Sequence, residues 1–170
     1  MQSTGHPLIK HFSQIQDEDN CRYPTSPELL SIGSNFSKAF GFQKIGVHHE
    51  YLPPGRRTSF PHAESSEEEF VYVIEGNPDV WIDGEIHRLS PGDGVGFKPG
   101  TGIAHTFMNN SKQIVRLLVV GEANKPENRI YYPLNPEMRE HRKGSWWEDV
   151  PTRQLGPHKG KPDAAISAGE

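Results

Sequence analysis

A histidine and two acidic residues lie close together before an apolar run, and another histidine follows later in the chain. His62 and Glu64 are two residues apart, and Glu69 directly precedes the run at 70–74. In a β-strand, residues i and i+2 point to the same face, so His62 and Glu64 can be directed at one point. Imidazole and carboxylate groups bind divalent metal ions such as Zn, Fe, Mn and Ni. The spacing therefore predicts a metal site, with His105 as a further candidate ligand.

The composition excludes several classes of partner. The 170 residues fit one globular domain, and a formal net charge of −4 gives no basis for binding nucleic acid or an anionic membrane. No apolar run approaches the roughly 20 residues that a bilayer-spanning helix needs, and Met1–Asn20 lacks the apolar core of a secretory signal. The single cysteine, Cys21, fits a reducing compartment. We therefore expect a cytoplasmic protein with no nucleic-acid or membrane partner.

Short apolar segments alternate with turn sequences along the middle of the chain. The 17 glycines and 15 prolines indicate tight turns, and Asp83-Gly84 is typical of a two-residue hairpin. The run at 70–74 is rich in β-branched and aromatic residues, which predicts a strand buried on both faces. The pattern predicts an all-β sandwich or barrel with strands at 43–51, 58–64, 70–74, 80–82, 85–89, 95–97, 104–108, 114–120 and 129–132.

Two sequence motifs resemble those of the cupins, which are small jelly-roll β-barrels. The first cupin motif joins a glycine, His-x-His, a glutamate and a second glycine, and the chain matches it at Gly55, His62, Glu69 and Gly76. The second motif joins glycines, a proline turn, a histidine and an asparagine, and the chain matches it at Gly92, Pro99, Gly102, His105 and Asn109. The chain departs from the family in two ways, because Glu64 replaces the second histidine and the approach to His105 is slightly longer.

The wider resemblance is to stand-alone single-domain cupins of bacteria and fungi, a group with no agreed activity. It rests on segments 52–55, 67–73, 94–97, 100–102, 147–151 and 155–158. It implies a single cupin-type jelly-roll barrel at 43–132, with an N-terminal arm and first strands at 1–42 and a C-terminal extension at 133–170. It also implies a homodimer. Cupins host many chemistries, so the fold brings no particular reaction with it.

Carried over from the cupin motifs, the metal ligands are His62, Glu64 in place of a histidine, Glu69 and His105. Two carboxylates neutralise a divalent cation, so the exchange of histidine for glutamate need not abolish binding. An octahedral ion would keep positions for water or substrate, as catalytic sites do. Four apolar residues share strand phase with these ligands and are expected to form the wall of a substrate pocket: Phe60, Val71, Val73 and Phe107.

Three classes of function remain open at this level. The first is a metal-dependent enzyme, of dioxygenase, isomerase or lyase type, that acts on a small organic molecule. The second is a non-catalytic cupin that binds or senses a small molecule, and the third is a storage or scaffold protein whose barrel has no cavity near His105. Within the enzyme class, His62, Glu64 and His105 would also satisfy the facial triad of 2-oxoglutarate oxygenases, with Arg116 as the co-substrate ligand.

Overall fold

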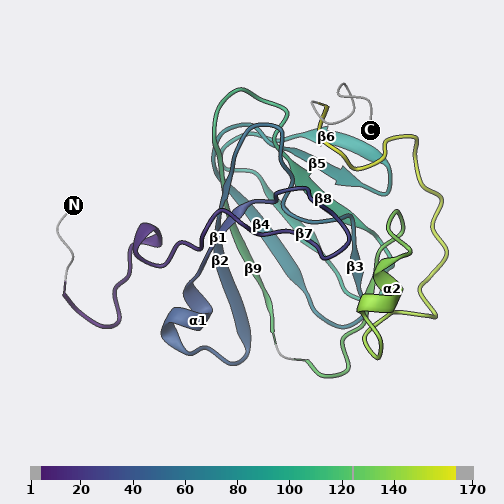
Figure 1. Cartoon of the computed structure of the whole chain (residues 1–170), viewed down its shortest axis with the longest axis horizontal. Helices are drawn as coiled ribbons and strands as arrows, with labels where there is room; N and C mark the ends of the chain where they lie inside the picture. The colour runs from purple at the N-terminus through teal and green to yellow at the C-terminus, as the bar shows by residue number, and fades with distance from the viewer. Residues whose placement is uncertain (1–4, 124, 164–170) are drawn as a thin grey trace.

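The computed structural model of the protein describes residues 5–123 and 125–163 and consists mainly of antiparallel β-sheets (Figure 1). One sheet has the strand order β1-β2-β9-β4-β7, a second has the order β6-β5-β8, and a third pairs β10 with β3. The strands are β1 (Ile32–Asn35), β2 (Ile45–Leu52), β3 (Ala63–Glu64), β4 (Glu69–Glu75), β5 (Asp79–Ile82), β6 (Glu85–Arg88), β7 (Gly94–Phe97), β8 (His105–Met108), β9 (Val115–Glu122) and β10 (Ile130–Tyr131). The predicted all-β fold is confirmed.

The main core lies between the five-stranded and the three-stranded sheet. Strand β9 is central in the large sheet, and it pairs with β2 along its whole length and with β4 on its other side. Alternate residues of these strands meet apolar residues of β5 and β8, and the buried cluster comprises Leu52, Val71, Val73, Val80, Phe107, Val115 and Leu117. The inner face of the large sheet is therefore the one that carries these positions.

Strand β4 differs from the prediction that both of its faces are buried. Val71 and Val73 face the core, but Phe70, Tyr72 and Ile74 are 45%, 40% and 45% exposed. Nothing in the described part of the chain covers this outer face fully. The ring of Phe70 lies across Gly94 on β7, where a side chain would collide with it. Strand β4 is thus apolar on both faces, although only one face is buried within a single chain.

The segment before β2 contains regular structure whose bounds the sequence pattern does not give. Strand β1 pairs with β2 and is followed directly by the short helix α1 (Phe36–Phe40). The Asn35 side chain accepts a hydrogen bond from the Lys38 amide and so caps the helix, and Gly41 ends it in the left-handed conformation. A 3-10 turn, η1 (Phe12–Gln14), lies in the N-terminal arm. The division of the chain at 43 and 132 stays a prediction, although β1 ties the first part to the large sheet.

The C-terminal extension packs along the outside of the small sheet (Figure 1). It contains the helix α2 (Met138–His141), and its residues 156–158 contact the β5–β6 hairpin. The indole Nε1 of fully buried Trp81 donates to the carbonyl of His158 at 2.8 Å, and the amide of Gly156 donates to the carbonyl of Asp83 at 2.7 Å. The extension is therefore part of the folded unit. No helix in the described residues is both long enough and apolar enough to cross a bilayer.

Candidate metal centre

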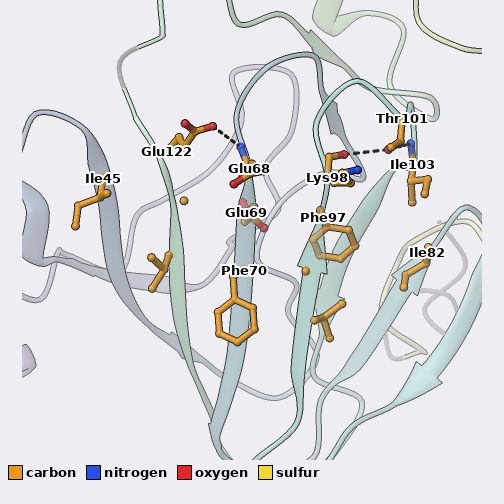
Figure 2. Close-up of a pocket in the computed structure, with 14 residues that line it drawn as sticks. Ile45, Glu68, Glu69, Phe70, Ile82, Phe97, Lys98, Thr101, Ile103 and Glu122 are labelled. Carbon is orange, nitrogen blue, oxygen red and sulfur yellow. Dashed lines mark hydrogen bonds between the residues drawn. The ribbon is translucent and has the colours of Figure 1, made fainter.

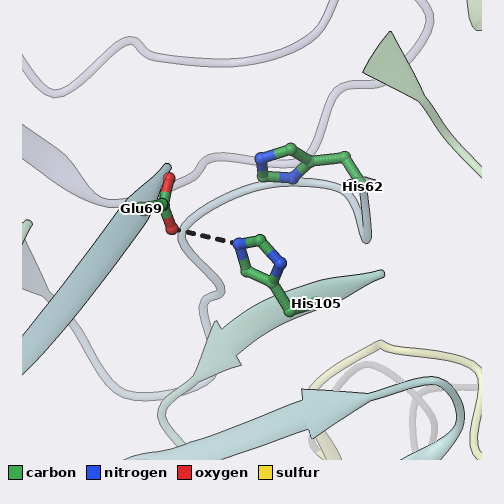
Figure 3. Close-up of side chains that lie close together, drawn as sticks. All are labelled: His62, Glu69 and His105. Carbon is green, nitrogen blue, oxygen red and sulfur yellow. Dashed lines mark hydrogen bonds and ion pairs between the residues drawn. The ribbon is translucent and has the colours of Figure 1, made fainter. Parts of the chain in front are cut away.

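Three of the four predicted ligands come together at one end of the barrel (Figure 3). One nitrogen each from His62 and His105 and one carboxylate oxygen of Glu69 lie within 4.8 Å of one another. Two imidazoles and one carboxylate form a donor set that suits Zn, Fe, Mn or Ni. It is the one such group of three or more potential ligands found among residues 5–123 and 125–163.

Backbone pairing holds the two histidines next to each other. His105 is the first residue of β8, and it forms an isolated antiparallel bridge with His62. The His62 amide donates to the His105 carbonyl at 3.1 Å, and the His105 amide donates to the His62 carbonyl at 2.9 Å. The ring centroids consequently lie 4.9 Å apart. The third member, Glu69, begins β4 on the facing sheet, so the site spans the gap between two sheets.

The His62 ring has the tautomer that metal binding requires. Its Nδ1 donates to the backbone carbonyl of Phe60 at 2.9 Å, which leaves Nε2 without a proton and free to act as a ligand. Burial, followed by the nearby His105, lowers the pKa of His62 to about 4. The imidazole is therefore neutral at physiological pH, as a metal ligand must be.

The His105 ring is fixed by contacts on its edge and on its face. Its Nε2 lies 3.0 Å from Oε1 of Glu69, and the Phe97 ring stacks on it with a centroid distance of 3.5 Å and an interplanar angle of 6°. The buried Nδ1 of His105 has no hydrogen-bond partner in the described part of the chain. Burial acts to raise the pKa of Glu69, but the hydrogen bond from His105 and the nearby histidines outweigh it and lower that pKa to about 2. Glu69 is therefore an anionic donor.

The fourth predicted ligand, Glu64, lies outside this group of three. It belongs to the two-residue strand β3, which pairs with β10 rather than with β8. Its carboxylate interacts with the side chain of Asn128, and burial, then the negative charges of Glu69 and Glu67, raise its pKa to about 7. The charge of Glu69 therefore affects the pKa of Glu64, although the Glu64 side chain interacts with Asn128.

A pocket of about 810 Å³ adjoins the metal centre at Glu69 (Figure 2). Its wall is largely apolar, and it is lined by Ile45, Glu68, Glu69, Phe70, Ile82, Val95, Gly96, Phe97, Lys98, Thr101, Ile103, Val120, Gly121 and Glu122. A storage or scaffold protein with no cavity near His105 is disfavoured, because Glu69 both lines this pocket and contacts His105.

The four residues predicted to form the pocket wall lie deeper in the molecule. Val71, Val73 and Phe107 belong to the close-packed main core, and Phe60 stacks on Tyr23 in a separate buried cluster. Phe97 takes the predicted role in their place, since it is paired in register with Glu69 across β4 and β7. The predicted strand at 95–97 ends at Phe97, but the sequence does not show that Phe97 pairs with Glu69, which only the register of β4 and β7 reveals.

Arg116 points away from the metal centre. Its neighbours in β9, Val115 and Leu117, face the core, so the intervening arginine faces outward. Its guanidinium group pairs with Glu75 at 3.1 Å and lies 4.9 Å from the ring centroid of Phe12. The structure therefore does not support Arg116 as a co-substrate ligand.

Comparison with known proteins finds a family match in the middle of the chain. Residues 48–121 match the profile of the cupin domain, and these residues include the ligands and the strands that hold them. Residues 48–121 therefore contain a cupin domain. No protein with a curated description matches the chain significantly. The jelly-roll cupin fold accounts for the two facing sheets and for the metal-type cluster at their mouth.

Solved structures resemble the chain over 60%, 75% and 82% of its length. A sugar phosphate isomerase of the superfamily from Silicibacter pomeroyi is 31% identical, with a TM-score of 0.58; the match covers 60% of this chain and 64% of that one. A candidate sugar phosphate isomerase from Acidithiobacillus ferrooxidans is 24% identical, with a TM-score of 0.65 and coverages of 75% and 81%. The polyketide cyclase RemF from Streptomyces resistomycificus is 18% identical, with a TM-score of 0.59 and coverages of 82% and 98%. The last two establish likeness of fold alone.

Proposed function

We propose that this cupin is a metal-dependent isomerase that acts on a small phosphorylated sugar. The observation that carries the proposal is the cluster of His62, Glu69 and His105, whose donor atoms lie within 4.8 Å of one another beside a pocket. The substrate class is suggested by the likeness to the isomerase from Silicibacter pomeroyi, which spans less than two thirds of that protein. Glu64 remains in the proposal as a fourth ligand, which would have to turn away from Asn128.

The residues present supply what an aldose–ketose isomerisation needs. A divalent ion bound at this site would act as a Lewis acid toward a carbonyl oxygen. Phe97 and Ile82 exclude water from one side of the pocket, which strengthens electrostatic interactions there. Lys98 is the one cationic side chain among the described residues that line the pocket, and it forms no ion pair in the described part of the chain. It is therefore available for a phosphate group.

The purified full-length protein tests this proposal directly. We expect about one divalent metal ion per chain by elemental analysis, and interconversion of fructose 6-phosphate or ribulose 5-phosphate with its aldose partner, followed by NMR. His62→Ala should abolish both. Absence of metal together with absence of turnover would reject the proposal, whereas binding of sugar phosphates without turnover would favour the non-catalytic cupin.

We also propose that the protein is a cytoplasmic homodimer that uses the outer face of β4. The exposed residues Phe70, Tyr72 and Ile74 form a row on this face, and Ile45 on β2 is 46% exposed near the same pocket mouth. Exposed apolar rows of this kind mark surfaces that another protein covers. A second copy of the chain is the occupant that we propose, because the same apolar row from each subunit would be self-complementary.

A further inference from the structure

Strand β2 carries two polar residues on the inner face of the barrel. His48 is opposite Val119 and Glu50 is opposite Leu117 in the register with β9, and both of these partners pack in the core. The next residue of the same phase, Leu52, is completely buried in that core. His48 and Glu50 therefore point inward, although both are only partly buried. Both side chains are therefore partly accessible to solvent.

Two glycine positions, which we call the recess, separate this polar wall from the metal centre. Gly46 on β2 and Glu69 on β4 are both paired with Gly121 on β9, so the three residues lie at one level of the sheet. Neighbouring strands are about 4.8 Å apart, which places the Cα atoms of Gly46 and Glu69 about 10 Å apart. The two glycines contribute no side chains to the inner face over this distance. The His48 ring lies over Gly46, and the Glu68 carbonyl lies 2.9 Å from the Cβ position of Gly121, so the part of the recess left for a small molecule is between the His48 ring and Glu69.

The His48 ring is directed at this recess. Its Nε2 lies 3.6 Å from the position that a Cβ atom would take on Gly46, and the Gly121 carbonyl lies 3.8 Å from the same position. The side chain has no hydrogen bond in the described part of the chain, and the charged groups that act on it are Glu69 and Asp17. Burial lowers the pKa of His48, so a neutral imidazole faces the recess at physiological pH.

We propose, on the basis of the isomerase function above, that His48 is the proton-transfer residue of this site. The carbon chain of the substrate lies between His48 Nε2 and the cluster of His62, Glu69 and His105. Glu50 is less suited to the role, because one of its oxygens accepts a hydrogen bond of 2.6 Å from the Ser31 hydroxyl. Glu50 also lies two residues further along β2 from Gly46, which is at the level of Glu69.

The step is balanced without any oxidant or reductant. His48 Nε2 removes the proton from the hydroxyl-bearing carbon next to the carbonyl group, and the C–H electron pair forms a carbon–carbon double bond. The carbonyl oxygen becomes a hydroxyl by taking the proton of the neighbouring hydroxyl, whose oxygen becomes the new carbonyl oxygen. The protonated imidazole then returns its proton to the former carbonyl carbon. His48 ends the cycle neutral, as it began.

The test compares three variants of the metal-loaded full-length protein. His48→Gln removes the base, Gly46→Ala adds a methyl group to the recess at ordinary contact distance, and His49→Gln is the matched control. His49 is the next residue in β2, but its ring faces outward and stacks on Phe12 at 4.2 Å. Two measurements are made: solvent deuterium incorporation during turnover of fructose 6-phosphate, and calorimetric affinity for erythronohydroxamate, a polyhydroxylated metal-binding probe.

We expect His48→Gln to lower kcat and deuterium incorporation by about 100-fold or more while the metal content stays constant. His48→Gln and Gly46→Ala should each weaken hydroxamate binding by about 10-fold, with no change for His49→Gln. Unchanged hydroxamate binding in both His48→Gln and Gly46→Ala would overturn the inference. If the wild-type protein turns over no sugar phosphate, the proposed function fails, and the hydroxamate measurement still decides whether the recess beside His48 is the ligand site.

Discussion

The Nε2 atom of His105 lies 3.0 Å from Oε1 of Glu69, and these two residues come from different sheets. The contact joins the three-stranded sheet to the five-stranded sheet at the end of the barrel where the cluster lies. It joins the first residue of β8 to the first residue of β4, which are 36 positions apart in the chain. A donor pair held in this way needs little rearrangement to receive a metal ion, because both side chains already converge.

Glu69→Gln should weaken metal binding by about 100-fold or more, because the variant keeps the shape of the side chain but loses the anionic donor. The measurement is competition with a fluorescent chelator for Zn or Mn. Glu68→Gln is the control. Glu68 is exposed, and because it directly precedes Glu69 in the chain, its side chain points to the opposite face. Equal affinities for wild type and Glu69→Gln would contradict the assignment.

Glu64→Gln decides the role of the fourth predicted ligand. Because Glu64 lies outside the cluster and interacts with Asn128, we expect its replacement to weaken metal binding by less than about 10-fold. A loss as large as that of Glu69→Gln would show that Glu64 turns inward when metal binds.

Glu50→Gln should stabilise the protein at pH 8 and change little at pH 4. Burial, then the nearby Asp17 and Glu69, raise the pKa of Glu50 to about 7, partly offset by the hydrogen bond from Ser31. Between pH 4.5 and 7 the folded protein holds a proton that the unfolded chain has released, so the stability contributed by this group falls as pH rises through that window. Removal of the charge should gain about 2 kcal/mol at pH 8.

Urea denaturation after removal of metal, followed between pH 4 and pH 8, measures this difference. Asp93→Asn is a suitable control, because Asp93 is exposed in the turn between β6 and β7 and lies outside the barrel interior. A stability difference between Glu50→Gln and wild type that does not vary with pH would show that Glu50 ionises normally.

Gly156→Ala should loosen the C-terminal extension. A Cβ atom on Gly156 would collide with the backbone of Gly84 in the β5–β6 hairpin. The expected cost is about 2 kcal/mol or more, seen as a lower Tm and a red shift of Trp81 fluorescence as the contact with His158 opens. Gly96→Ala is the control, because its Cβ atom would meet nothing within 4 Å. A Gly156→Ala variant as stable as Gly96→Ala would show that the C-terminal extension shifts to accommodate the methyl group without loss of stability.

Phe70→Glu should convert the proposed homodimer into a monomer. The ring is 45% exposed in the single chain, so a charge at this position costs the folded monomer little but would be buried in a dimer contact. Light scattering after size-exclusion chromatography gives the mass of each species. A dimer that survives Phe70→Glu and Tyr72→Glu together would place the subunit contact on another surface.

The sequence predicted most strands because the segments alternate regularly and the turns between them have distinctive residues. The Asp83-Gly84 hairpin is confirmed, with φ values of 47° and 96° at its two central residues. First strands were expected within 1–42, but without bounds, because residues Ile32–Asn35 have no alternation of their own and become a strand by pairing with β2. The outer face of β4 was predicted to be buried because apolarity alone does not distinguish a core from an unpaired surface.

The site was predictable in part for a similar reason. The i, i+2 rule places His62 and Glu64 together only in a continuous strand, but the chain changes partner between them: His62 bridges β8, and β3 pairs with β10. Glu69 and Phe97 face the centre because of the register between β4 and β7. Long-range register of this kind depends on tertiary packing, which local sequence patterns do not encode.

The Phe97 stack on His105 has a consequence for metal selectivity. Phe97 is paired in register with Glu69, so one pair of strands determines both the tilt of the imidazole and the position of the carboxylate. Sliding β7 relative to β4 would change both donors together. A rigid donor set tolerates only ions whose bond lengths match it, whereas a smaller residue at position 97 would let the ring swing and accept a wider range of ions. The Phe97 ring would therefore restrict the size of the ion that the site accepts, although it would not bind the metal itself.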